Sequence, residues 1–185
     1  MISEEKKCWI GLNMVPYLLP GQLHKLLKAF GSAPAVMKAK EEHLAQCGIS
    51  VEAAKKITRL MEGSELEKEI EAIENEGVGV IALYENEYPR ILRYTFDPPI
   101  ALYVKGALEE KDYISIAVVG CRKVSPYGRL IAERLSKALA EKGFCVVSGL
   151  ARGVDTVAHG ACLAAGGRTI AVLGNGLKTI YPYEN

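Results

Sequence analysis

The chain has 185 residues, of which 49% are hydrophobic and 24% charged, and its formal net charge is +1. This composition indicates a globular protein with room for one large or two small domains. No apolar run reaches the ~18 residues of a membrane span, and the N-terminus MISEEKKC lacks a signal-peptide core, so we expect a cytoplasmic protein without membrane contacts. Five cysteines without a C-x-x-C pair favour free thiols over disulfides or a zinc site.

Charge is distributed unevenly along the chain. Residues 1–62 hold 9 Lys and Arg against 6 Asp and Glu, residues 63–113 hold 5 against 12, and residues 114–185 hold 9 against 4. The positive charge is therefore concentrated in the last segment. A nearly neutral protein can still bind nucleic acid through one positive face, because phosphate charge is neutralised locally.

Residues 8–62 have the pattern of a small helical bundle. One apolar stripe at helical spacing follows Pro20-Gly21 and consists of Leu23, Leu26, Leu27 and Phe30. Ser50 is placed to cap a last helix that runs to about residue 62. Gly63-Ser64 then marks the expected boundary between a domain of residues 1–62 and one of residues 63–185.

Residues 63–113 begin the second predicted domain. Ser64 and Glu67 have the spacing of a capping box, and an acidic helix over 65–76 is expected to bury Leu66 and Ile73. Strands are predicted over 78–84 and 100–104, with a proline-rich segment between them that forbids a long helix. The acidic helix is most simply a solvated face, with a docking patch for a basic partner as the alternative.

Residues 114–176 repeat the order strand, glycine loop, helix. The strands are ISIAVVG, FCVVSG and RTIAVLG, and helices are expected over 126–142 and 155–165. The first strand is nearly all apolar, which is typical of a parallel strand buried on both faces. The following helix is expected to pack through one apolar face that consists of Ile131, Leu135, Ala138 and Leu139. This βαβ pattern predicts an α/β fold with a Rossmann-like, mostly parallel doubly wound sheet.

The loops after these strands combine glycines with cations. Ligands of such sheets bind at the carboxyl ends of the strands, where helix N-termini favour anions. Arg122, Lys123 and Arg152 lie in these loops rather than on outer helix faces. We therefore predict a phosphate-binding cleft, against the alternative that the glycines only serve turns and the cations are solvated.

The usual nucleotide fingerprints are missing. The first strand ends in Gly120-Cys121-Arg122 without the later glycines of G-x-G-x-x-G, and no G-x-x-x-x-G-K-[ST] occurs. A bound dinucleotide or triphosphate is therefore disfavoured, and no cofactor or metal is expected.

Two enzyme classes are alternatives to a binding protein. Ser148, Asp155 and His159 invite a hydrolase interpretation, but Ser148 is not in G-x-S-x-G and the other two lie four apart on one helix face, a spacing that suits a local hydrogen bond. A nucleoside-monophosphate phosphoribohydrolase would need G-G-x-G-T-x-x-E, which is absent. Catalytic residues are therefore not predicted.

Three segments resemble the DNA-processing protein A family (DprA, also called Smf). Its pattern is a strand ending in glycine and arginine, then S-G-x-A-x-G-[IV]-D-x-x-A-H, then A-V-L-G-x-G-x-x-x-x-Y-P-x-x-N. These segments appear here as Gly120-Cys121-Arg122, as residues 148–159, and as residues 171–176 followed by Tyr181-Pro182 and Asn185. Several irregular loops agree at the right separations, which makes the match specific.

The resemblance implies a cytoplasmic bacterial protein that binds single-stranded DNA without cutting it. It further implies an interaction with a RecA-type recombinase, which such proteins help to load during natural transformation, competence and recombination. A homodimer of the full-length protein is also implied. Residues 1–62 would be a module like a sterile-alpha-motif or helix-hairpin-helix domain, and its Leu18-Leu19-Pro20-Gly21 turn favours packing or a partner over DNA contact.

A DNA site at the loops follows from the resemblance and from the loop chemistry together. Asp155 and His159 are predicted to structure the pocket, with Asp155 orienting Arg152 or His159. Ser148 would offer its hydroxyl and N–H to a phosphate, and Tyr127 or Tyr181 could stack a base. The predicted DNA contacts are Gly120, Arg122, Lys123, Ser148, Gly149, Arg152, Gly153, Gly174 and Asn175.

This sequence departs from the family pattern at two positions. Cys121 stands where Ser or Thr is common, and Lys178 stands where an Asp is common, so a role for an acid there is not carried over. Family members also continue well beyond the motif that ends at Asn185, sometimes into a winged-helix domain. We therefore expect residues 63–185 to be the N-terminal part of the Rossmann-like domain.

Overall fold

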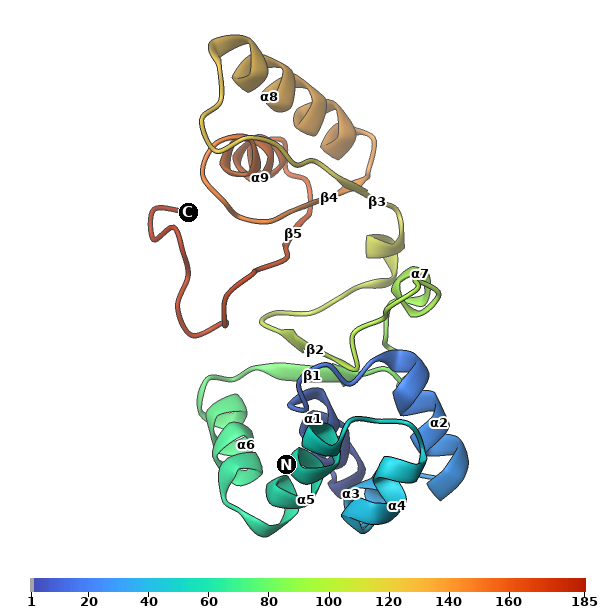
Figure 1. Cartoon of the computed structure of the whole chain (residues 1–185). Coiled ribbons are helices and arrows are strands. Elements are labelled where there is room, and N and C mark those ends of the chain that lie inside the picture. The colour runs from blue at the N-terminus through green and yellow to red at the C-terminus, as the bar shows by residue number, and fades with distance from the viewer. Residues whose placement is uncertain (1) are drawn as a thin grey trace. The chain divides into compact units, whose positions relative to one another are not determined.

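The computed structural model describes residues 2–185 and divides into two compact units, one up to Gly106 and one from Ala107 onward. Figure 1 shows the first unit in blue to green and the second in yellow to red. Each unit has its own secondary structure and its own hydrophobic core. We describe each unit by itself.

The first unit begins with five helices. They are α1 (Glu4–Asn13), α2 (Pro20–Phe30), α3 (Ala33–Met37), α4 (Glu41–Gln46) and α5 (Val51–Glu62). Ser3, Ser32 and Ser50 each accept a backbone N–H bond at a helix N-terminus, which satisfies donors that the first turn leaves free. The helical bundle predicted for residues 8–62 is confirmed.

The rest of the first unit is a helix and a two-stranded sheet. They are α6 (Glu65–Asn75), β1 (Gly79–Ala82) and β2 (Ala101–Val104), and the short helix α7 (Arg90–Arg93) lies between the strands. β1 and β2 pair antiparallel, with Gly79 opposite Val104. Both predicted strands are present and shorter than expected. Ser64 makes no side-chain bond to the start of α6, so the predicted capping box is wrong.

The first unit extends past the predicted domain boundary at residues 62 and 63. Leu66 and Ile73 of α6, together with Val80 and Ala82 of β1, are buried in the same core as helices α1 to α5. Burial of this apolar surface joins the two-stranded sheet to the bundle. The division between compact units therefore falls near residue 106.

The second unit is a three-stranded parallel sheet with two helices. In chain order it contains η1 (Glu110–Tyr113), β3 (Ser115–Ala117), α8 (Pro126–Glu141), β4 (Cys145–Ser148), α9 (Val154–Ala164) and β5 (Thr169–Ala171). The strand order is β3-β4-β5, and Ile116, Val146 and Thr169 stand side by side. The predicted α/β class with a partial Rossmann-like sheet is confirmed.

Both helices of the second unit lie on one side of its sheet and pack against each other (Figure 1). Small residues allow this close approach, because α8 buries Ala132, Ser136 and Ala140. Ile131 and Leu135, predicted on the buried face, are 42% and 48% exposed. The predicted burial was wrong because α8 faces α9 with its small residues and leaves these larger ones outside.

Strand β3 is also more exposed than predicted. Ser115, Ile116 and Ala117 are all exposed, whereas a strand buried on both faces was expected. β3 is an edge strand of the three that the structure describes, and its one neighbour is β4. An edge strand loses the cover that a strand on its other side would give.

Arg168 ties the start of β5 to the segment before β3. Its Nη2 donates to Asp112 Oδ2 at 2.8 Å, and its Nη1 lies 2.9 Å from Glu109 Oε1. The hydrogen bond from Arg168 holds the pKa of Asp112 below its usual value. One cation of the basic segment is thus neutralised at the amino end of the sheet.

Candidate nucleic-acid interface

Three loops leave the carboxyl ends of β3, β4 and β5. We call residues 118–125 the first loop, residues 149–153 the second loop and residues 172–180 the third loop. The parallel register places the ends of the strands at one edge of the sheet. Each predicted contact residue except Ser148, the last residue of β4, lies in one of these loops.

The first and second loops are locked together at Gly153. The Val154 N–H donates to the Cys121 carbonyl at 3.3 Å. Gly153 has φ +88°, and a Cβ there would lie 2.6 Å from the Arg122 carbonyl oxygen and closer still to that of Cys121. Only glycine fits this contact and this backbone conformation. The structure therefore brings the Arg122 and Arg152 segments together.

Arg122 and Lys123 are the free cations of the first loop. Both are exposed, and neither has an ion-pair partner among residues 2–185. Gly120 precedes them, and a Cβ at that position would fall 2.6 Å from a methyl carbon of Val154. The packing of Gly120 on α9 thus fixes the backbone that carries the two cations.

The second loop is organised by Asp155, which is 6% exposed. Its Oδ2 accepts the N–H groups of Gly149 at 3.2 Å and Ala151 at 3.3 Å. Leu150, between these two residues, has φ +57°, which is unusual for a residue with a side chain. The carboxylate lies in the first turn of α9, where the helix dipole favours a negative charge.

The Asp155 carboxylate therefore accepts the backbone N–H bonds that were predicted to bind a phosphate at this loop. The Gly149 N–H already has an acceptor in the protein, so its predicted role as a phosphate donor is corrected. The predicted shaping role of Asp155 acts through two backbone amides rather than through Arg152 or His159. A buried carboxylate that accepts two N–H bonds makes the loop rigid.

Ser148 also has an internal role. Its side chain is buried, and its Oγ donates to the Val118 carbonyl at 2.6 Å. This bond joins β4 to the chain after β3 and uses the only hydroxyl hydrogen. The prediction that this hydroxyl faces a phosphate is therefore corrected.

His159 is buried between α9 and the sheet. Its Nδ1 lies 2.6 Å from Thr169 Oγ1, and that hydroxyl donates to the Val146 carbonyl at 2.7 Å. Because the hydroxyl has one hydrogen, it accepts from Nδ1, which must carry the imidazole proton. Burial lowers the pKa of His159, so the neutral form is favoured. Ser148, Asp155 and His159 each bond elsewhere and form no hydrogen-bonded relay.

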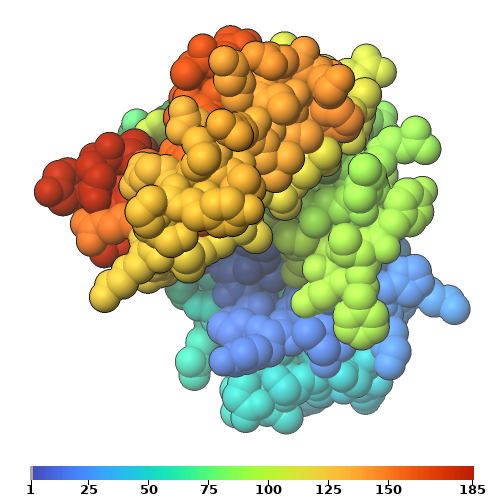
Figure 2. All heavy atoms as spheres, turned by 90° about the horizontal axis from the view of Figure 1, so that it is seen from above, coloured from blue at the N-terminus to red at the C-terminus, as the bar shows by residue number. Residues whose placement is uncertain are grey.

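The segment 181–185 covers the second loop. Arg152 Nε donates to Glu184 Oε1 at 2.7 Å, and the guanidinium lies over the Tyr181 ring, 5.7 Å from its centroid. Asn185 Nδ2 donates to the Leu150 carbonyl at 2.8 Å. In Figure 2 the dark-red end of the chain lies against orange atoms of the second unit.

Arg152 is consequently paired, although its side chain remains 52% exposed. The hydrogen bond to Glu184 raises the pKa of Arg152 and lowers that of Glu184. Glu184 could not be predicted as a partner of Arg152, because no local pattern signals a contact between residues 32 positions apart. This carboxylate occupies a face of the guanidinium that a phosphate would use.

Gly174 and Asn175 lie exposed in the third loop. The Asn175 side-chain amide donates to the carbonyls of Gly176 and Thr179, so it shapes its own loop. The start of the third loop is joined to the end of β4, where the Val172 N–H donates to the Ser148 carbonyl at 2.8 Å. Residues 2–185 contain no group of three or more His, Cys, Asp or Glu placed to hold a metal ion. In the same part of the chain, no helix is long and apolar enough to cross a membrane.

Known proteins resemble this chain in sequence and in fold. DNA processing protein DprA of Bacillus subtilis is 38% identical over 122 residues, which are 65% of this chain and 41% of that protein. Protein Smf of Synechocystis is 31% identical over 190 residues, covering 100% of this chain and 48% of that protein. The chain spans less than half the length of these two relatives.

A solved structure and a family profile agree with these relatives. The X-ray structure of DNA processing protein A from Streptococcus pneumoniae has a TM-score of 0.76 and 30% identity to this chain, and the match covers 97% of this chain and 61% of that one. The profile of DNA recombination-mediator protein A matches residues 79–185. This range contains all three loops. The chain belongs to the DNA recombination-mediator protein A family, whose members include the DprA and Smf proteins.

Proposed function

We propose that this chain provides a binding surface for single-stranded DNA in a recombination mediator. The single observation that carries the proposal is the pair of exposed cations Arg122 and Lys123, which make no ion pair within residues 2–185 and lie on a first loop held against Gly153. Their charges would contact backbone phosphates, which bind without regard to sequence. The names of the relatives, which refer to DNA processing and recombination, support this choice of ligand.

Several features favour binding over catalysis. The three residues that could have formed a hydrolase relay are each committed to internal hydrogen bonds. Arg152 would contribute after exchanging the Glu184 carboxylate for a phosphate. Gly174 and Asn175 would border the strand from the third loop, and Tyr127 or Tyr181, both exposed, would stack a base.

The proposal extends to the whole protein. It would act in the cytoplasm as a homodimer, bind incoming single-stranded DNA and help a RecA-type recombinase to assemble on it. The printed description of the family, a recombination mediator, supports a recombinase partner. Co-sedimentation of the purified protein with a RecA-type recombinase, with and without DNA, tests this part separately.

The DNA site is tested by Arg122→Ala in a fluorescence-anisotropy titration with a labelled single strand. Loss of one phosphate contact should weaken binding to all sequences and reduce the salt slope of log K by about 0.7. Arg134→Ala is the matched control, because Arg134 is an exposed arginine of α8 outside the three loops. Equal affinity of Arg122→Ala and wild type would remove the site from the first loop. Release of adenine from AMP by the same protein would instead favour a nucleotide-processing enzyme.

A further inference from the structure

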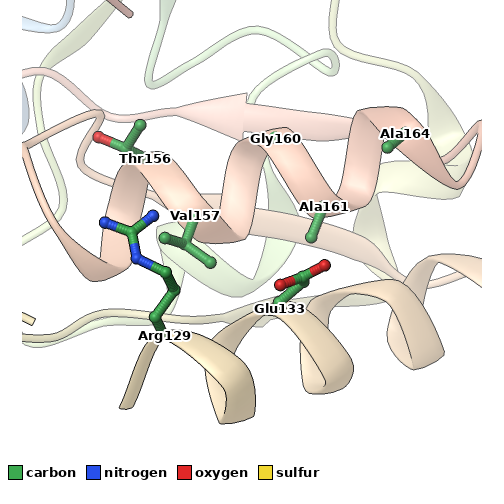
Figure 3. A pocket seen from close by; sticks show the side chains of 7 residues that line it. All are labelled: Arg129, Glu133, Thr156, Val157, Gly160, Ala161 and Ala164. Carbon is green, nitrogen blue, oxygen red and sulfur yellow. The ribbon is translucent and has the colours of Figure 1, made fainter. Parts of the chain in front are cut away.

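A groove of about 300 Å³ runs between α8 and α9. Its rim on α8 carries Arg129 and Glu133, and its floor on α9 is made of small side chains (Figure 3). Figure 3 shows the Arg129 guanidinium pointing toward Thr156, and the Glu133 carboxylate lying one turn further along, beside Ala161.

Both charges on this rim are free. Arg129 and Glu133 are four residues apart on one helix, yet within residues 2–185 neither makes an ion pair. Four other cations of the second unit, Lys111, Lys137, Arg152 and Arg168, have acidic partners. Arg129 therefore resembles Arg122 and Lys123 in being exposed and available to an outside anion.

One end of the groove lies next to the second loop. Thr156, at its end nearest the loops, donates its hydroxyl to the Ala151 carbonyl of the second loop at 2.9 Å and accepts from Asn185 Nδ2 at 2.8 Å. Arg129 lies in the first turn of α8, which is capped by Ser125 at the end of the first loop. Arg129 is thus in the first turn of the helix into which the first loop, with Arg122 and Lys123, leads.

We propose that a single strand bound at the loops continues into this groove, where Arg129 contacts a backbone phosphate and Glu133 repels the backbone from the other end. The inference rests on the proposed function. A protein helix is a poorer occupant, because the floor has no side chain larger than valine and offers little apolar area to bury; it consists of Thr156, Val157, Gly160, Ala161 and Ala164. A flexible strand needs only a hollow and a cation beside it.

The test is a titration of the full chain with a labelled single strand at several salt concentrations. Arg129→Ala should weaken binding roughly threefold, as expected for one exposed ion pair, and should reduce the salt slope by about 0.7. Glu133→Gln should strengthen binding by a similar factor. Arg129→Lys should restore most of the slope, because a phosphate contact requires charge rather than a particular shape.

Arg134→Ala is the matched control, since this arginine lies on α8 outside the groove. If Arg129→Ala and Glu133→Gln both behave as this control while Arg122→Ala weakens binding, the groove inference is overturned and the proposed function stands. If the wild-type chain binds no single strand, both are overturned. If Arg129→Ala impairs recombinase binding while leaving DNA affinity intact, the groove serves a protein and the inference is again overturned.

Discussion

The first and second loops each combine glycine with arginine, but they differ in which polar groups they leave available to a ligand. In the first loop, Arg122 and Lys123 are exposed and make no ion pair among the described residues. In the second loop, Asp155 takes the amides of Gly149 and Ala151, and Glu184 takes the Arg152 guanidinium. The second loop is therefore satisfied by anions from its own chain.

This difference shows what a glycine-and-cation pattern can indicate. The pattern reports that a loop can accept an anion, because backbone N–H groups and guanidinium donors are close together. It does not report whether the anion is external or a carboxylate of the same protein. In the proposed function, the first loop therefore offers its cations to the strand, and the second loop mainly supports the first loop.

The largest effect on stability is expected for Gly153→Ala, because this substitution disrupts the contact between the first and second loops. The added methyl would collide with the carbonyls of the first loop, and φ +88° is strained for alanine. The free energy of unfolding should therefore decrease by about 3 kcal/mol or more. Urea denaturation measures this change. Gly160→Ala is the control, because a Cβ there meets nothing within 4 Å, and it should stabilise α9 by about 0.5 to 1 kcal/mol. Equal stability of the two variants would mean that the loops are not locked at Gly153.

Asp155→Ala should have the next largest effect. It leaves the N–H groups of Gly149 and Ala151 without their acceptor, which costs about 2 to 3 kcal/mol in the free energy of unfolding. Asp155→Asn keeps one acceptor oxygen and should reduce the free energy of unfolding less than Asp155→Ala does. If inorganic phosphate raises the melting temperature of Asp155→Ala and not of the wild type, the carboxylate occupies an anion position. An unchanged melting temperature in Asp155→Ala would contradict the supporting role.

His159 should make stability depend on pH. Its folded-state pKa is lowered by burial, while the unfolded-state value is about 6.5. Below that pH the unfolded chain binds the proton more readily than the folded chain. The free energy of unfolding is therefore intact above about pH 6.5 and decreases as the pH falls, by at most about 1.4 kcal/mol per pH unit for one group. Denaturation curves between pH 7 and 5 measure the slope, and His159→Gln should flatten it. A slope identical in both proteins would assign the effect to other groups.

The smallest expected effect is that of Glu184→Gln. Removing this charge frees Arg152 for a phosphate, so affinity for a single strand should rise about twofold at low salt. The gain should shrink as salt is added, since exposed charges are screened. Glu133→Gln in the same assay compares the two carboxylates beside the proposed DNA path. Weaker binding of Glu184→Gln would show that Glu184 orients Arg152 rather than competing with the strand.

The fold could be predicted from the sequence wherever the signal was local. Ser50 caps α5, as its position in the sequence indicates. Burial on α8 was predicted wrongly, because Ile131 and Leu135 have the right spacing but face away from α9. Spacing identifies a stripe on a helix, whereas the neighbour that the helix packs against decides which stripe is buried.

The sequence by itself determined the α/β class, the three glycine loops after parallel strands, and the family to which the chain belongs. These features follow from hydrophobic periodicity and from residues with special backbone conformations, which act over a few positions. Only the tertiary structure decided which polar groups remain free. Ser148 bonds to the Val118 carbonyl, Asp155 to two loop amides, and Arg152 to Glu184. Pairings of this kind depend on how separate segments of the chain pack together.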